Sequence, residues 1–313
     1  MNTTGRKSIK MQDNFRRVLP MNYNYKKVCT AVVALTIAMS AMITASSCAA
    51  GSSEPVSVTY ETKVETAETT IVTTEEPEPP LVLLPEAEER LGTYEHYAGW
   101  ISIPGIVDEP VVQYTDNAYY LDKNSATQQY DVGGAIYADF RCVLDTRKRS
   151  ENIVLYGHNQ KDGTRFGQLD FYKWNPLTYY KKQPVISYNT AYDEREYKIF
   201  AMFIINTKEE HDTRPLFDYH NYIELDDDAR FNEFVEQCRK RSLVITDVDI
   251  QRDDHFLTLS TCSTEFDESR FVIVAREVRE GESSEVDVST AKTNTNPLYP
   301  AIFYKYNGGS YIE

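Results

Sequence analysis

The sequence predicts a mainly β fold with a few helices, arranged as a small closed or nearly closed β-barrel. Short runs of β-type residues follow one another, turn residues such as Asp162-Gly163 separate them, and long helical periodicity is rare among them. The expected strands cover residues 100–103, 111–112, 135–137, 152–156, 185–188, 199–205, 256–259 and 271–275.

An apolar segment near the N-terminus predicts a membrane anchor. Residues 28–45 carry no charge and, at about 18 residues, can cross a bilayer core. Basic residues in the polar segment 1–27 and acidic residues after the apolar run orient residues 1–27 toward the cytoplasm and the rest of the chain outside. A single-pass signal anchor at 28–47 explains this pattern. A lipoprotein signal that ends at a lipidated Cys48 explains it as well, because Ala45-Ser46-Ser47-Cys48 resembles a lipoprotein cleavage box.

The segment 48–85 is rich in Ser, Thr, Glu and Pro and is expected to be a disordered acidic spacer. The folded domain is expected at 86–280. Residues 281–313 form a C-terminal extension whose Pro and Tyr content predicts packing against the barrel.

Two helices are expected in the folded domain. The first covers residues 86–97. The second covers residues 226–241, before the last two strands, with three Asp at its start and basic residues at its end. Its apolar stripe follows the spacing i, i+3, i+4 and i+7 and consists of Phe231, Phe234, Val235 and Cys238.

Charge and cysteine usage exclude several classes of protein. A formal net charge of −15 argues against nucleic-acid binding, which needs clustered Lys and Arg. Neither a CxxC pair nor an HExxH motif is present, so no metal site is expected. Three of the five cysteines lie in the folded region, and an odd number in an exported protein leaves at least one free thiol.

Cys262 is the candidate nucleophile. It comes directly after a predicted strand, so the sheet would hold the thiol at the rim of the barrel, where substrates have access. A buried, inert cysteine is the alternative. Cys142 and Cys238 fit that alternative, since Cys238 lies on the apolar stripe of the helix.

A nucleophilic thiol needs a nearby imidazole or cation. His158 follows the strand 152–156, and Gly157 permits a sharp turn toward the rim. His255 would lie roughly 20 Å from Cys262 along one strand. His96 is expected on the exposed part of a helix, and His211 and His220 in a solvated connection.

Arg270 begins the next strand after the loop 263–269, so a hairpin would return it to Cys262, where it could bind an oxyanion. A surface ion pair with Glu265, Asp267 or Glu268 is the alternative for this arginine. Arg276 would lie roughly 20 Å further along the strand.

These residues resemble the sortase family. Thr258-Leu259-Ser260-Thr261-Cys262 is similar to its nucleophile motif, and Arg270 stands at its arginine position. The segment 152–159, which ends in Tyr156-Gly157-His158-Asn159 and is followed by Phe166-Gly167, resembles the histidine region of class B. Gly99-Trp100-Ile101, Pro110-Val111-Val112-Gln113 and residues 116–121 also resemble class B. The resemblance spans about residues 91–277, and the combined motifs are highly specific.

The resemblance implies a sortase-like barrel with the chemistry of a thiol transpeptidase. Cys262 would attack the carbonyl of a Thr in the C-terminal sorting motif of a secreted protein, with His158 as general acid and base and Arg270 on the oxyanion. An amine of a cell-wall peptide, from lipid II or peptidoglycan, would accept the acyl group without any cofactor. Ser263 stands where some class B members have Glu, which leaves the preferred motif open.

The resemblance also implies a substrate groove and an extracellular site on a cell membrane of the Gram-positive type. The residues that match the groove are Asn117, Leu121, Tyr156, Ser260, Tyr222 and Ile223. A cysteine peptidase that hydrolyses the same motif without transfer, and a catalytically silent surface-binding module, are the alternatives.

Overall fold

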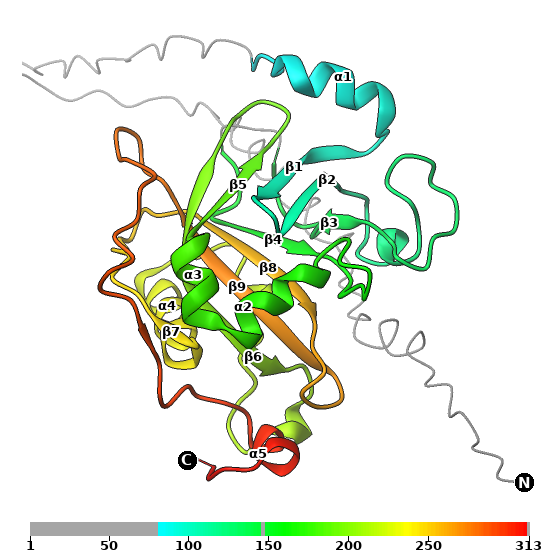
Figure 1. Cartoon of the computed structure of the whole chain (residues 1–313). Coiled ribbons are helices and arrows are strands. Elements are labelled where there is room, and N and C mark those ends of the chain that lie inside the picture. Colours follow the sequence, from blue (N-terminus) through cyan, green and yellow to red (C-terminus); the bar gives the residue numbers. More distant parts are fainter. Residues whose placement is uncertain (1–80, 145–147, 312–313) are drawn as a thin grey trace, which may run out of the picture. The chain divides into compact units, whose positions relative to one another are not determined.

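Eight strands close into a barrel in the computed structural model, which describes residues 81–144 and 148–311 (Figure 1). The order around the barrel is β1-β2-β3-β4-β8-β9-β6-β5, and β5 pairs with β1. The strands are β1 (Tyr97–Ile103), β2 (Val107–Val112), β3 (Ile136–Ala138), β4 (Asn152–Tyr156), β5 (Val185–Asn189), β6 (Glu196–Asn206), β8 (Phe256–Cys262) and β9 (Ser269–Glu277). The prediction of a mainly β, closed barrel is confirmed.

Helices and one small sheet surround the barrel. The α-helices are α1 (Pro85–Thr93), α2 (Asp170–Trp174), α3 (Pro176–Lys182), α4 (Asp228–Arg241) and α5 (Ala301–Asn307). The 3₁₀ helices are η2 (Tyr119–Leu121), η3 (Gly167–Leu169), η4 (Glu209–His211) and η5 (Tyr219–Asn221). Outside the barrel, β7 (Val244–Ile245) pairs with β10 (Lys292–Thr293).

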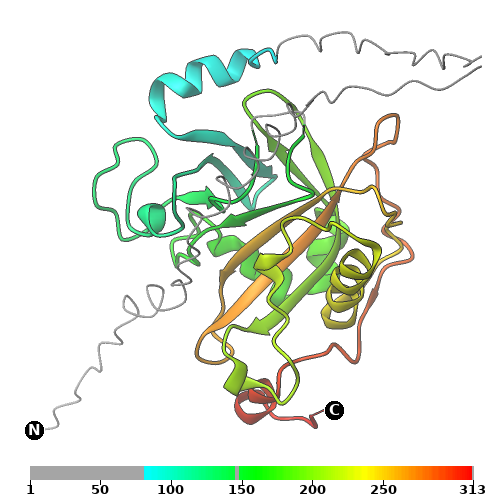
Figure 2. The same ribbon diagram turned by 180° about the vertical axis from the view of Figure 1, so that it is seen from behind.

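The strands β6, β8 and β9 are buried on both faces. On one face they join the core that includes Tyr172 of α2 and Tyr180 of α3. On the other face they join the core that includes Phe231 and Phe234 of α4. Figures 1 and 2 show α2 and α3 on one side of these strands and α4 on the other. Burial on both faces explains why these strands are nearly continuous apolar runs in the sequence.

The helix α4 begins at Asp228, because the side chain of Asp227 caps it by accepting a 2.8 Å hydrogen bond from the backbone N of Arg230. The first helix ends at Thr93, so the predicted extent of 86–97 is too long, since Tyr97 already belongs to β1. The prediction that His96 lies on a helix is therefore wrong. Its Nδ1 lies 2.7 Å from the hydroxyl of Tyr120.

The C-terminal segment contacts the barrel at several points. The rings of Tyr299 and Phe303 stack with centroids 3.8 Å apart, and both rings pack on the core that contains α2 and α3. The hydroxyl of Tyr311 donates a 2.8 Å hydrogen bond to Asp212. These contacts hold α5 beside the connection that follows β6.

The expected membrane-anchored localisation needs correction. Among the described residues, none of the helices combines the length and the apolar character that a bilayer crossing requires, so no single-pass anchor is seen. The segments 1–27 and 28–47, Cys48 and the spacer as far as residue 80 lie outside the described residues.

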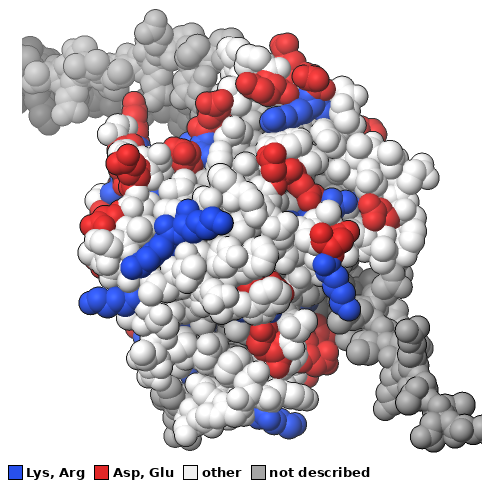
Figure 3. Space-filling model, in the orientation of Figure 1, with Lys and Arg blue, Asp and Glu red and all other residues white. Residues whose placement is uncertain are grey.

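The surface carries charges of both signs. On the face drawn in Figure 3, acidic side chains lie among the basic ones. The described residues on that face therefore form no basic track of the kind that a nucleic-acid backbone binds.

Candidate active site

Strand pairing brings the C-terminal ends of β4 and β8 and the start of β9 to one rim of the barrel. The strands β4 and β8 run parallel, with Tyr156 opposite Ser260, and the backbone N of Gly157 continues the pairing by donating to the carbonyl of Ser260 at 3.2 Å. His158 and Cys262 therefore leave adjacent strands at the same edge. The sequence placed Cys262 after its strand, whereas it is the last residue of β8.

The hairpin formed by β8 and β9 places Arg270 directly opposite Cys262. Side chains of directly opposed residues point to the same face of a sheet, and side chains alternate along a strand. Ser260, Cys262 and Arg270 therefore share one face. Arg276 pairs with Phe256 at the other end of the same two strands.

Asn159 joins the histidine segment to the strand that ends in the candidate nucleophile. Its side-chain Nδ2 donates to the carbonyl oxygen of Cys262 at 3.1 Å and to Oδ1 of Asp170 at 3.0 Å. The resemblance included Asn159 in a motif, but no role followed from the sequence. Its place directly after His158 in that motif was the available signal.

The imidazole of His158 is held by the loop before β3. Its Nε2 lies 2.7 Å from the backbone carbonyl of Leu121. A carbonyl oxygen only accepts hydrogen bonds, so Nε2 carries a proton in this arrangement. Leu121 thus contributes its backbone to the site by orienting the ring.

Opposing electrostatic effects act on the half-buried thiol of Cys262. Burial raises the pKa of the thiol, the guanidinium of Arg270 opposes that rise, and the carboxylate of Glu268 adds to it, so that the pKa is raised overall. Arg270 is 7% exposed and lies 3.6 Å from a carboxylate oxygen of Glu268. Arg270 therefore has an ion pair with Glu268, but this pair is buried beside the thiol and is not the surface pair expected as the alternative.

The other two cysteines in the described part of the chain are buried and free. Burial raises the pKa of Cys142 to about 12 and raises that of Cys238 as well. Neither thiol is available as a nucleophile in these surroundings.

A fully buried carboxylate organises one wall of the expected groove. Asp139 accepts hydrogen bonds from Arg141, from Nδ2 of Asn117 at 2.9 Å and from the hydroxyl of Tyr156 at 2.9 Å. Burial tends to raise the pKa of Asp139, but hydrogen bonds and charge from Arg141, with help from Asn117, lower it overall. Sequence reasoning missed Asp139 because only the fold brings β3, β4 and the preceding loop together.

The remaining groove candidates lie in different surroundings. Ser260 is buried, and its Oγ lies 2.7 Å from the hydroxyl of Tyr219. Tyr222 packs against Phe217 and Phe234 in the core beneath α4. Ile223 is 6% exposed and belongs to the core on the other face of the sheet. Tyr222 and Ile223 are therefore mostly buried, as Asn117 and Ser260 also are, and their contact with substrate stays a prediction.

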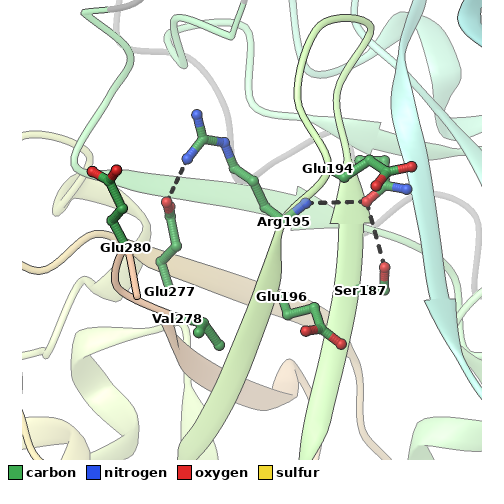
Figure 4. Close-up of a pocket in the computed structure, with 8 residues that line it drawn as sticks. Ser187, Glu194, Arg195, Glu196, Glu277, Val278 and Glu280 are labelled. Atoms are coloured by element: carbon green, nitrogen blue, oxygen red, sulfur yellow. Dashed lines mark hydrogen bonds and ion pairs between the residues drawn. The ribbon is translucent and has the colours of Figure 1, made fainter. Parts of the chain in front are cut away.

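A polar pocket lies beside Glu277, the last residue of β9 (Figure 4). Cys262 pairs with Arg270 near the opposite end of that strand. The pocket has a volume of about 550 Å³. Its carboxylates include Glu277, which pairs with Arg195 at 2.5 Å. None of the described residues that line it is a cysteine. The lining residues are Ser187, Asn189, Glu194, Arg195, Glu196, Glu277, Val278 and Glu280.

Comparisons with known proteins match the barrel. The model of the sortase domain family matches residues 101–278. Sortase B of Staphylococcus aureus (strain NCTC 8325 / PS 47) is 28% identical over 200 residues, which cover 62% of this chain and 75% of that protein. The structure of the S. aureus sortase B–substrate complex is similar with a TM-score of 0.54 and 26% identity, over 63% of this chain and 86% of that one. A structure of Sortase B complexed with triglycine also has a TM-score of 0.54 and 26% identity, over 62% and 86% of the two chains.

The first prediction concerns the thiol. Arg270→Ala removes the charge that lowers the pKa of Cys262, so the midpoint of its alkylation by iodoacetamide should move to higher pH. Glu268→Gln removes a charge that raises this pKa, so the midpoint should move to lower pH. Rates measured against pH, with Cys262→Ala as the blank, check both directions. Equal midpoints in all three proteins would contradict the electrostatic account.

The second prediction concerns Asp139. Asp139→Asn removes the charge of a buried carboxylate that accepts hydrogen bonds from Arg141, Asn117 and Tyr156, and should lower the free energy of unfolding by about 2 kcal/mol. Asp193→Asn, at a more exposed pair with Arg195, should lower it by less than about 1 kcal/mol. Urea unfolding of both variants measures the difference.

The effect of Asp139→Asn should depend on pH. Because folding lowers the pKa of Asp139, its carboxylate stabilises the fold fully above the unfolded-state pKa of about 3.9. This contribution is lost as the pH falls through the lower folded-state pKa. The gap between wild type and Asp139→Asn should therefore shrink in acid, and a gap that widens there would refute the assignment.

Proposed function

Since the chain belongs to the sortase family and is a cysteine transpeptidase of that kind, we propose that it cleaves a C-terminal sorting motif of secreted proteins after Thr and transfers the acyl fragment to a cell-wall amine. The observation that carries the proposal is the pairing register of β4, β8 and β9 at the rim of the barrel. Cys262 lies opposite Arg270, and Asn159, next to His158, bonds to the carbonyl of Cys262.

In the first half of the reaction, Sγ of Cys262 forms a bond to the carbonyl carbon of the Thr. The thiol proton passes to His158, because the raised pKa keeps this thiol protonated until a base removes its proton. The guanidinium of Arg270 stabilises the oxyanion of the tetrahedral intermediate. His158 then protonates the leaving amine as the C–N bond breaks, which leaves a thioacyl-enzyme.

In the second half, an amine attacks the thioacyl carbon and loses a proton to His158. The C–S bond breaks, and the thiol of Cys262 regains a proton. The related Sortase B structure in complex with triglycine supports an amine-bearing peptide as the class of acceptor. An amine on lipid II or peptidoglycan belongs to this class.

We propose that the substrate groove includes Asn117, Leu121, Tyr156 and Ser260, together with Tyr222 and Ile223. The loop that carries Asn117 and Leu121 also bonds to His158, so peptide binding and ring orientation use the same segment. The half-buried Tyr156 lies between Asp139 and the strand that ends at Cys262. These contacts support a groove that runs along the loop before β3 toward the thiol.

The third prediction tests this function in the full-length chain with a fluorogenic library of sorting peptides and triglycine. Cys262→Ala should abolish cleavage, and His158→Ala should reduce it by about 10²- to 10⁴-fold. The matched control Cys142→Ala should retain cleavage, because its thiol lies in the core. Mass spectrometry of the products detects the ligated peptide.

Each outcome separates the candidate activities. Full cleavage by Cys262→Ala would refute the proposal. Hydrolysed product without any ligated product, at saturating triglycine, would favour a cysteine peptidase. A wild type that cleaves no peptide and whose Cys262 resists a thiol-reactive sorting-peptide analogue would favour a binding module.

A further inference from the structure

A buried lysine on α2 joins the two sides of the candidate active site. Lys173 is 8% exposed, and its Nζ lies 3.0 Å from Oδ1 of Asp170 and 3.0 Å from Oε1 of Glu265. It also donates to Oγ of Ser263 at 3.3 Å. One ammonium group therefore compensates two carboxylates that come from separate segments.

Each carboxylate also accepts hydrogen bonds from a segment that adjoins a candidate catalytic residue. Asp170 accepts a hydrogen bond from Asn159, which in turn holds the carbonyl of Cys262. Glu265 accepts from the backbone N of Thr264 at 3.1 Å and from the hydroxyl of Ser263. The network thus holds the residue after His158 and the residues after Cys262 at the same time.

Stability alone gives little reason for this cluster. Desolvation of a buried ion pair costs about as much as the attraction returns, and apolar residues of similar volume are often as stable. Such a cluster does impose a defined geometry, because its hydrogen bonds are satisfied in only one arrangement.

The network reaches the backbone around Cys262, whereas Arg270 and Glu268 are the charges that act on its thiol. The helix α2, which carries Lys173, packs on one face of the sheet. Arg270 lies on the opposite face, because it shares its side of β9 with Val272, which belongs to the core of that face. An effect of Lys173 on the reaction would therefore be one of position and not of thiol acidity.

We propose that Lys173 is a positioning residue that, through Asp170–Asn159 on one side and Glu265–Ser263 on the other, fixes Cys262 relative to His158. The effect of Lys173 on turnover rests on the proposed function, whereas its effect on the segments after His158 and after Cys262 rests on the contacts themselves.

The C-terminal extension contacts the loop between β8 and β9, because Nδ2 of Asn307 donates to the carbonyl of Glu265 at 3.2 Å.

The fourth prediction tests Lys173 in the full-length chain. Lys173→Met should lower kcat about 10- to 100-fold with KM unchanged, as expected for a small misplacement of reacting groups. Amide hydrogen exchange should become faster at 157–160 and 263–268. The midpoint of Cys262 alkylation against pH should stay at the wild-type value. Lys173→Arg, which keeps the charge, should recover most of the lost kcat.

Lys198→Met is the matched control. Lys198 is equally buried and pairs with Glu282 at 2.6 Å, but its strand position faces Arg276, at the far end from Arg270. This control should retain kcat and normal exchange in both segments even if it lowers overall stability.

Two results would overturn the inference. One is an unchanged kcat in Lys173→Met, and the other is an equal loss of kcat in Lys198→Met, which would mean that only general stability matters. If the wild type cleaves no sorting peptide, the proposed function fails separately. In that case faster exchange confined to Lys173→Met still supports the positioning role, and exchange equal to wild type refutes it.

Discussion

The arrangement of the candidate site depends on the pairing of three strands. Parallel pairing of β4 with β8 places the ends of both strands at one rim, and antiparallel pairing of β8 with β9 returns the chain to that rim. A slip of one residue between β8 and β9 would turn Arg270 to the opposite face from Cys262. Burial of these strands on both faces resists such a slip, because it would exchange the residues of the two cores.

Strand pairing alone does not set the geometry of the side chains at the rim. Hydrogen bonds to buried charged residues also hold the segments that carry these side chains. Asp139 ties the loop before β3 to the end of β4, and Lys173 ties α2 to the segments around His158 and Cys262. The Asp139 cluster bonds to Asn117 and Tyr156 of the proposed groove, whereas the Lys173 cluster bonds to Asn159 and Ser263, which flank His158 and Cys262 in the chain. The thiol itself is placed where burial disfavours the thiolate and Arg270 favours it, so its reactivity depends on small changes in this environment.

The sequence by itself determined the fold class and singled out three candidate catalytic residues. Short runs of β-type residues between turn residues predicted the barrel strands, and the apolar stripe with its acidic start predicted α4. The position of Cys262, His158 and Arg270 next to strand ends was also local information. The sequence did not predict α2, α3 and β7, because these short elements carry too few residues for a periodic signal. The predicted helix 86–97 is too long, because Tyr97 fits the pattern of a helix as well as that of a strand.

Only the tertiary structure decided which distant polar residues support the site. Asp139 and Lys173 have no special local pattern, and Asn159 stands in a motif that gave it no role. The roles of all three arise from contacts across α2, the loop before β3 and the strand ends. It also placed Tyr222 against Phe217 and Phe234, a contact that the sequence did not indicate. The physical reason is that periodicity records which face of an element is buried, whereas partners in a buried polar network are chosen by three-dimensional distance.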